Sequence, residues 1–281
     1  MNKIIVCTDG SQYSQVACEY AAWLSEARNA SITALYVTDL RLFETPAVAD
    51  LSGSMGIQPY EGMIAQMREA EEIKAKFVEE QAMAVFQKHG VEAKVEFIHK
   101  TGLLVDTLRD MVDSTDIVVL GKRGESANFD QEHLGSMLER VVRSLKVPCF
   151  VSNRELFEIK QVAIAYDGSE SCEKAIDFII SQQSLHHLDF HVLSCVEGHD
   201  EKLVSQRLSD VESQFEAAGL KATYQTLNGE VETAIAEYVT DSSVDLLFLG
   251  AYGHSRIRKF LIGSTTTELL RSCHVPVFCF R

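Results

Sequence analysis

A glycine-rich loop near the end of the chain carries the residue types that bind phosphate. Residues 250–269, GAYGHSRIRKFLIGSTTTEL, contain three glycines and then four hydroxyl residues in a row. Glycine lets the backbone approach a ligand where a Cβ would collide, and the free N–H groups at a helix start attract anions. Three basic residues lie between the second and third glycines: Arg256, Arg258 and Lys259. The spacing predicts an anion cradle that suits a phosphate chain.

The loop leads into a predicted helix. Thr265 and Glu268 have the spacing of a capping box, so the N–H groups of the first turn lie beside Gly263 and Ser264. Charge-assisted hydrogen bonds contribute about 1.5–3 kcal/mol each, so three or four of them can hold a phosphate chain. The loop is not a P-loop, because Ser264 stands where that motif has lysine.

A second candidate residue follows a strand-like run at residues 161–166. Asp167 lies in the sequence YDGS directly after this run. An acidic side chain there would repel a pyrophosphate, which excludes the dinucleotide-binding fingerprint. It suits the neutral end of a nucleotide, where it would accept hydrogen bonds from a base amine or a ribose hydroxyl. The alternative is that Asp167 is the N-cap of the following helix.

The same landmarks occur twice, in the same order. KIIVCTDGS matches QVAIAYDGS, DIVVLGKRG matches DLLFLGAYG, and KVPCFVS matches HVPVFCF near the two ends. The offset falls from 158 between Asp9 and Asp167 to 129 between Gly121 and Gly250, so the first half has 29 extra residues before its loop. Most of these belong to residues 39–63, which predict a surface excursion, with a lid or a docking loop as alternatives. Two domains are predicted, residues 1–154 and 155–281.

Each half alternates short apolar runs with longer amphipathic ones, which is typical of a parallel sheet covered by helices. The predicted strands of the second half are residues 161–166, 188–195, 220–226, 244–250 and 275–280. The fold class is therefore α/β, with two doubly wound domains, each a five-stranded parallel sheet of order 3-2-1-4-5. Ligands of such sheets bind beyond the carboxyl ends of the strands, where Gly250 lies.

This arrangement resembles the universal stress protein family over nearly the whole chain, as a tandem member with two repeats. The ATP-binding branch of that family is marked by Gly, two residues, Gly, nine residues, Gly, then Ser or Thr, and the loop at 250–264 matches without a gap. The resemblance implies that Val196 contacts adenosine, and Ser264 and Thr265 the phosphates. The implied nucleotide-binding residues are Asp167, Val196, Gly250, Gly253, Arg256, Gly263, Ser264 and Thr265. The implied ligand is ATP, with AMP or ADP as alternatives and Mg²⁺ accompanying ATP.

The first half departs from this pattern. Ten residues separate Gly124 from the next glycine, and three acidic ones replace the basic cluster: Glu125, Asp130 and Glu132. One carboxylate about 8 Å from a phosphate charge costs roughly 2 kcal/mol at an effective dielectric near 20. Lys122, Arg123 and His133 partly compensate, so AMP, another small ligand or an empty pocket all stay open. The residues of this second, weaker site are Asp9, Gly121, Gly124, Gly135 and Ser136.

Composition excludes several classes of function. The net charge of -15 argues against a nucleic-acid surface, which needs a broad basic face. No apolar window approaches the length of a membrane span, and the start has no secretion signal, so we expect a cytoplasmic protein without membrane contact. The 7 cysteines include no C-x-x-C pair and are expected to be reduced and buried. The histidines near residue 190 form no convergent ligand set, so no metal site is expected.

These features favour a nucleotide-binding regulatory module of the stress response, in which ATP tunes contacts with an unidentified protein partner. The alternatives are a slow ATPase and a scaffold with vestigial pockets. Catalysis of phosphoryl transfer needs a base or a water-positioning group, and the loop offers only His254, so no catalytic residue is assigned. Single-domain relatives pair through their last strands, so residues 147–151 and 275–280 are predicted to pair within the chain as a pseudo-dimer. A further homodimer stays open.

Overall fold

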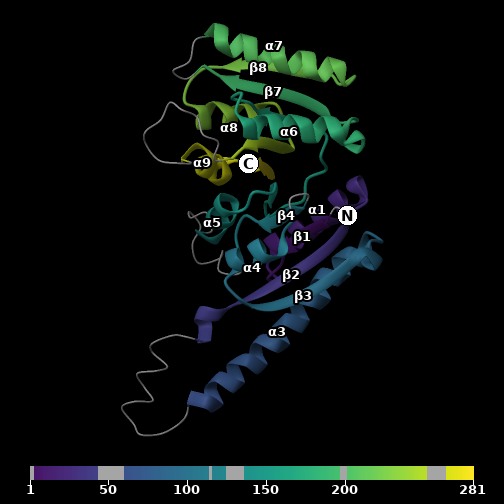
Figure 1. Cartoon of the computed structure of the whole chain (residues 1–281), viewed down its shortest axis with the longest axis vertical. Coiled ribbons are helices and arrows are strands. Elements are labelled where there is room, and N and C mark those ends of the chain that lie inside the picture. Colours follow the sequence, from purple (N-terminus) through teal and green to yellow (C-terminus); the bar gives the residue numbers. More distant parts are fainter. Residues whose placement is uncertain (1–2, 44–59, 114–115, 125–135, 197–200, 252–263) are drawn as a thin grey trace.

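A computed structural model describes residues 3–43, 60–113, 116–124, 136–196, 201–251 and 264–281. Strands and helices alternate along most of the chain (Figure 1). The strands are β1 Lys3–Cys7, β2 Ser31–Asp39, β3 Val95–Gly102, β4 Ile117–Gly121, β5 Cys149–Ser152, β6 Gln161–Ala165, β7 Asp189–Cys195, β8 Ala222–Leu227, β9 Leu246–Gly250 and β10 Val277–Phe280. The helices are α1 Gln12–Arg28, α3 Tyr60–Lys88, α4 Leu104–Met111, α5 Ser136–Ser144, α6 Glu170–Ser181, α7 Glu201–Ala217, α8 Val231–Asp241 and α9 Ser264–Ser272. Short 3-10 turns lie at Leu40–Phe43, Glu92–Lys94 and Gln183–Leu185.

The strands form one 10-stranded sheet in the order β3-β2-β1-β4-β5-β10-β9-β6-β7-β8. Each half therefore has the predicted order 3-2-1-4-5, and all pairings within a half are parallel. The halves meet at β5 and β10, which pair antiparallel with Phe150 opposite Phe278. This confirms the predicted pairing of the two last strands within one chain. Pro148 and Pro276 precede these two strands. Their carbonyl oxygens accept hydrogen bonds from the N–H groups of Val118 in β4 and Leu247 in β9.

Helices cover both faces of this sheet, so each face carries a hydrophobic core that runs through both halves. One core includes residues of α1, α3, α6 and α7, and the other includes residues of α4, α5, α8 and α9. Strands that are buried on both faces have continuously apolar sequences. β4 and β9 are examples, because their first four residues are all apolar and all buried.

An aromatic cluster fills the core where the halves join. The Phe278 ring lies 5.4 Å from that of Phe150 in the first half, and 5.1 Å and 4.7 Å from those of Phe248 and Phe280. Phe178 of α6 packs edge-on against Phe278 at 5.2 Å. The halves therefore share one apolar junction in addition to the strand pairing.

The extra residues of the first half lead into a long helix. Of the predicted excursion at residues 39–63, the structure describes the end of β2, a 3-10 turn and the start of α3, while residues 44–59 lie outside the described part. α3 is rich in charged residues, and it extends past the edge of the sheet (Figure 1). None of the described helices is both long and apolar enough to span a membrane.

Candidate functional site

The DGS turns after β1 and β6 have the same geometry. The Asp9 carboxylate accepts a hydrogen bond from the N–H of Ser11 at 2.9 Å, and the Asp167 carboxylate accepts one from the N–H of Ser169 at 2.8 Å. The glycine between them has a positive φ in both turns, +81° and +76°, which favours glycine over residues with a Cβ. The serines, not the aspartates, are the N-caps of α1 and α6. The alternative that Asp167 caps the helix is therefore wrong.

A cavity of about 250 Å³ lies beyond the carboxyl ends of β1, β2 and β4. Three residues predicted for the weaker site line it, namely Asp9, Gly121 and Gly124. An ideal Cβ on Gly124 would lie 2.9 Å from the Asp9 carboxylate, so glycine allows the loop to approach this side chain. Gly135 lies outside the described residues, and Ser136 is the first residue of α5. The tertiary structure thus brings Asp9, Gly121 and Gly124 together.

The first glycine of each loop has a packing role. A Cβ on Gly250 would lie 2.8 Å from Ser171 Oγ and 3.0 Å from the backbone nitrogen of Cys172, at the start of α6. A Cβ on Gly121 would lie 2.8 Å from the Cβ of Tyr13 in α1. Real Cβ atoms do not approach other atoms this closely without displacing them. Glycine at these positions is explained by contact between strand end and helix, independently of any ligand.

Lys122 joins the first-half loop to the second half. Its ammonium group donates to the carbonyl oxygens of Arg271 and Cys273, at 3.1 and 2.8 Å, at the C-terminal end of α9. Cations are stabilising at this end of a helix. Burial is the main cause that lowers the pKa of Lys122 to about 8; Cys273 opposes this shift and nearby Arg123 adds to it. The ammonium that was expected to offset the acidic loop is therefore bonded across the junction.

The Lys122→Met variant should show a different pH dependence of stability from the native chain. Because the folded chain releases this proton near pH 8 and the unfolded chain near 10.5, the unfolded chain binds more protons between these values. The native free energy of unfolding should therefore rise relative to the variant by about 2 kcal/mol from about pH 7.5 to about pH 9.5. Urea denaturation at several pH values measures the free energy of unfolding of both chains. Lys146→Met, at an exposed lysine, is the control for the loss of one lysine charge. A constant difference between native chain and Lys122→Met would contradict the assignment.

In the second half the structure describes part of the predicted site. Asp167 follows β6 and is exposed, and Val196 follows β7, where its N–H donates to Leu227 at 3.0 Å. Ser264 is the first residue of α9. The Thr265 hydroxyl donates to the Glu232 carboxylate of α8 at 2.8 Å. Gly253, Arg256, Arg258, Lys259 and Gly263 lie outside the described residues.

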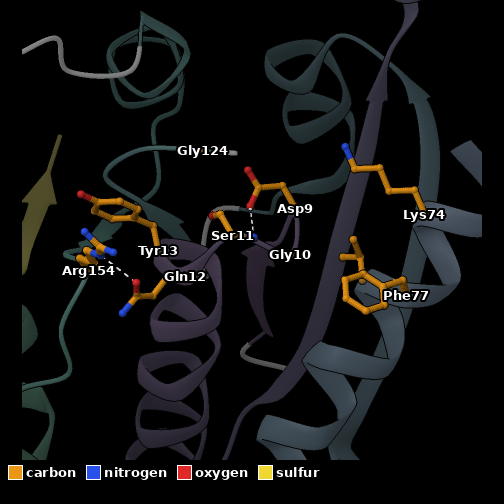
Figure 2. A pocket seen from close by; sticks show the side chains of 10 residues that line it. Asp9, Gly10, Ser11, Gln12, Tyr13, Lys74, Phe77, Gly124 and Arg154 are labelled. Carbon is orange, nitrogen blue, oxygen red and sulfur yellow. Dashed lines mark hydrogen bonds between the residues drawn. The ribbon is translucent and has the colours of Figure 1, made fainter. Parts of the chain in front are cut away.

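Sequence reasoning missed the carboxylate of Glu232. It lies 33 positions before Thr265 and shares no motif with it, so only the packing of α8 on α9 brings the two together. It also missed a larger cavity, of about 360 Å³, which shares Asp9 and Gly124 with the first one. In Figure 2, Lys74 and Phe77 of α3 lie on one side of Asp9, while Arg154 lies on the other and is bonded to Gln12 at 2.7 Å. No local signal predicts this arrangement, because it depends on where α3 packs.

Two further predictions concern metal and thiol chemistry. His191 bonds Tyr238 and Gln161 through its two ring nitrogens, both at 2.8 Å. Within the described ranges there is no group of three or more His, Cys, Asp or Glu side chains that could hold a metal ion. Most cysteines are buried, none is in a disulfide, and burial raises the pKa values of Cys18 and Cys149 to about 12. These thiols behave as core residues.

Comparison with known proteins gives a consistent result. The universal stress protein family pattern matches residues 1–153 and 158–281. The chain is 40% identical over 288 residues to universal stress protein Slr1230 from Synechocystis, covering 100% of both chains. A universal stress protein from Archaeoglobus fulgidus has a similar fold, with a TM-score of 0.73 at 20% identity over 99% of this chain and 98% of its own. The protein PA1789 from Pseudomonas aeruginosa, described as functionally unknown, has a TM-score of 0.63 at 11% identity, over 99% and 92% of the two chains. The chain belongs to the universal stress protein family, as a member with two copies of the family's domain.

Proposed function

We propose that this protein is a nucleotide-binding regulatory protein that holds one ATP in its second half. The observation that carries the proposal is the glycine pattern of residues 250–264 in its structural setting. β9 ends at Gly250 and α9 begins at Ser264, so the loop joins the carboxyl end of a central strand to a helix start. This is the position where parallel sheets bind ligands and where N–H groups attract phosphate.

The proposed adenosine contacts lie at the same edge of the sheet. β6 pairs parallel with both β9 and β7, so the carboxyl ends of all three strands meet there. Asp167 follows β6, and its carboxylate can accept from a base amine or a ribose hydroxyl in addition to the Ser169 N–H, because a carboxylate has about four acceptor sites. Val196 follows β7 and would pack on the adenosine.

The Thr265 contact favours a magnesium complex of ATP. Thr265 donates its single hydroxyl proton to Glu232, so toward a ligand it offers only lone pairs. A phosphate oxygen needs a donor, whereas Mg²⁺ binds oxygen lone pairs and is often held by one or two carboxylates together with substrate phosphates. We therefore assign Thr265 and Glu232 to the metal side of MgATP, and the N–H groups of the α9 start to the phosphates.

The same carboxylate is the observation that favours the second candidate, slow ATP hydrolysis. A carboxylate near the phosphates is a group that phosphoryl transfer uses, and the loop sequence alone did not supply one. Phosphate release over hours, with Asp167→Ala as the control that removes adenosine binding, separates this candidate from pure binding. If the protein only binds ATP, the native chain should release phosphate no faster than the Asp167→Ala variant.

Titration calorimetry with MgATP tests the proposed function. We expect one site per chain, weakened about a hundredfold or more by Gly263→Asp and nearly unchanged by Gly135→Asp. An aspartate in the cradle costs roughly 2 kcal/mol for each nearby phosphate charge, and about 1.4 kcal/mol is a factor of ten in affinity. The same substitution in the first half is the matched control. Two equivalent sites, or loss of binding only in Gly135→Asp, would overturn the assignment.

A further inference from the structure

The two helices that follow the glycine loops are each bonded at their C-terminal end to the opposite half of the chain. These helices, α5 and α9, lie on either side of the junction, and each has 9 residues (Figure 1). Arg281, which follows β10 of the second half, donates to the carbonyl oxygen of Arg143 in α5. Asn153, which follows β5 of the first half, donates to the carbonyl oxygen of His274 just beyond α9. The end of each helix is therefore held by a residue of the other half.

Lys122 makes this arrangement unequal. Its ammonium adds two bonds at the end of α9, to the carbonyl oxygens of Arg271 and Cys273 at 3.1 and 2.8 Å. Arg271 is among the last four residues of the helix, whose carbonyls have no partner within it. The repeat places Ala251 at the corresponding position of the second half, and alanine has no side-chain donor to offer α5. The helix end nearer the intact glycine loop thus receives a cation that α5 does not receive from the equivalent position.

The Lys122 ammonium and the proposed phosphate site lie at opposite ends of one short helix. With 9 residues, α9 is about 13 Å long, so the ammonium lies about 15 Å from a phosphate bound at the helix start. The N-terminal end of a helix attracts anions, and its C-terminal end is stabilised by cations. At an effective dielectric near 20, a cation about 15 Å from one phosphate charge attracts it by an amount worth about sixfold in affinity before screening.

We propose that Lys122 of the first half is a positioning residue for ATP in the second half. Together with Asn153 it holds the C-terminal end of α9, so that the N–H groups at the start of this helix are fixed where the phosphates bind. Its charge adds an attraction along the helix. The proposal rests on the ATP site proposed above and adds regulation to it. Because Lys122 belongs to the first-half loop, a change in that loop alters ATP affinity in the other half.

The charge of Lys122 can be removed without a mutation. Its pKa is about 8, and the two ionisable groups that act on it besides burial are Arg123 and Cys273. Burial raises the pKa of Cys273 to about 11, so this thiol stays neutral when Lys122 loses its proton. The other ionisable side chains at this helix end are bonded to neighbours, Arg271 to Glu268 and His274 to Thr240. Raising the pH from about 7 to about 9.5 therefore removes the cation at the end of α9.

Titration calorimetry with MgATP on the full chain at these two pH values tests the proposal. The native chain should bind about fivefold more weakly at the higher pH, which corresponds to about 1 kcal/mol. Lys122→Met should bind about fivefold more weakly than the native chain at the lower pH and show no pH dependence. Lys122→Arg keeps a cation that does not titrate in this range. It should match native affinity within about twofold at the lower pH and lose the pH dependence, which a merely structural role of Lys122 does not predict.

Arg281→Met is the matched control, because it removes a donor from the end of α5 and leaves α9 unchanged. Its MgATP affinity should stay within about twofold of the native value. A native affinity that is equal at both pH values would overturn the proposal without any variant, and so would equal losses in Lys122→Met and Arg281→Met. A native chain that binds MgATP no more tightly than Lys122→Met refutes only the role of Lys122. A native chain that does not bind MgATP at either pH refutes the proposed function and this proposal with it.

Discussion

Replacing Phe278 by alanine is expected to lower the free energy of unfolding by about 3–5 kcal/mol, the usual cost of removing a buried aromatic ring. Phe278 is 1% exposed and contacts the rings of Phe150, Phe178, Phe248 and Phe280. The ring lies where β5 and β10 join the halves, so the cavity left behind has walls from both. Urea denaturation followed by circular dichroism measures the loss.

Fluorescence shows whether the two halves unfold together. The single tryptophan, Trp23, lies on α1 in the first half and packs against the core that includes Phe278. In Phe278→Ala, the midpoint of urea unfolding followed by Trp23 fluorescence should shift by as much as the midpoint followed by circular dichroism. Phe77→Ala, at a side chain that is 56% exposed, is the matched control and should change stability by no more than about 0.5 kcal/mol. An unshifted Trp23 transition in Phe278→Ala would show that the junction contributes nothing to the first half.

Gly250→Ala is expected to cost about 1–3 kcal/mol of folding stability, as overpacking in a filled core does. The added methyl group would lie 2.8 Å from Ser171 Oγ and Cys172 Sγ, and 3.0 Å from the backbone nitrogen of Cys172. The backbone contact cannot be relieved by a rotamer change, so α6 must move relative to β9. Thermal or urea denaturation measures the loss.

Gly102→Ala is the matched control for this substitution. Gly102 also ends a strand, but its added methyl group would meet only the Thr107 hydroxyl at 3.2 Å, which a rotamer change relieves. We expect a loss below about 1 kcal/mol there. If Gly250→Ala keeps full stability and loses only ATP binding, the glycine serves the ligand rather than the packing of α6.

The sequence by itself determined the elements and their order. The predicted strands of the second half agree with β6 to β10 within two residues at each end. The repeated DGS and Val-Pro landmarks predicted two equivalent halves. The elements and the repeat are predictable because hydrophobic period, turn residues and repeats are local properties of the chain. The pairing of β5 with β10 was predicted only from the resemblance to single-domain members of the family.

The DGS turns mark the limit of local reasoning. Both the aspartate and the serine of such a turn have side chains that can cap a helix, and the sequence does not say which one does. In the folded chain Ser169 accepts from Cys172, whereas Asp167 accepts from Ser169 and remains at the strand end. The Asp167 carboxylate therefore stays exposed at the strand end and is not used as the helix cap.

The roles of the polar side chains near the two sites were decided by tertiary structure alone. From the sequence, Lys122 is predicted to be a cation near a phosphate. In the folded chain it donates hydrogen bonds to the carbonyl oxygens of Arg271 and Cys273, about 150 positions away. Thr265 reads as a phosphate contact, yet its proton goes to Glu232 on the neighbouring helix. The physical reason is that hydrogen bonds between distant residues depend on which helix ends the sheet topology brings together, and local sequence carries no information about that distance.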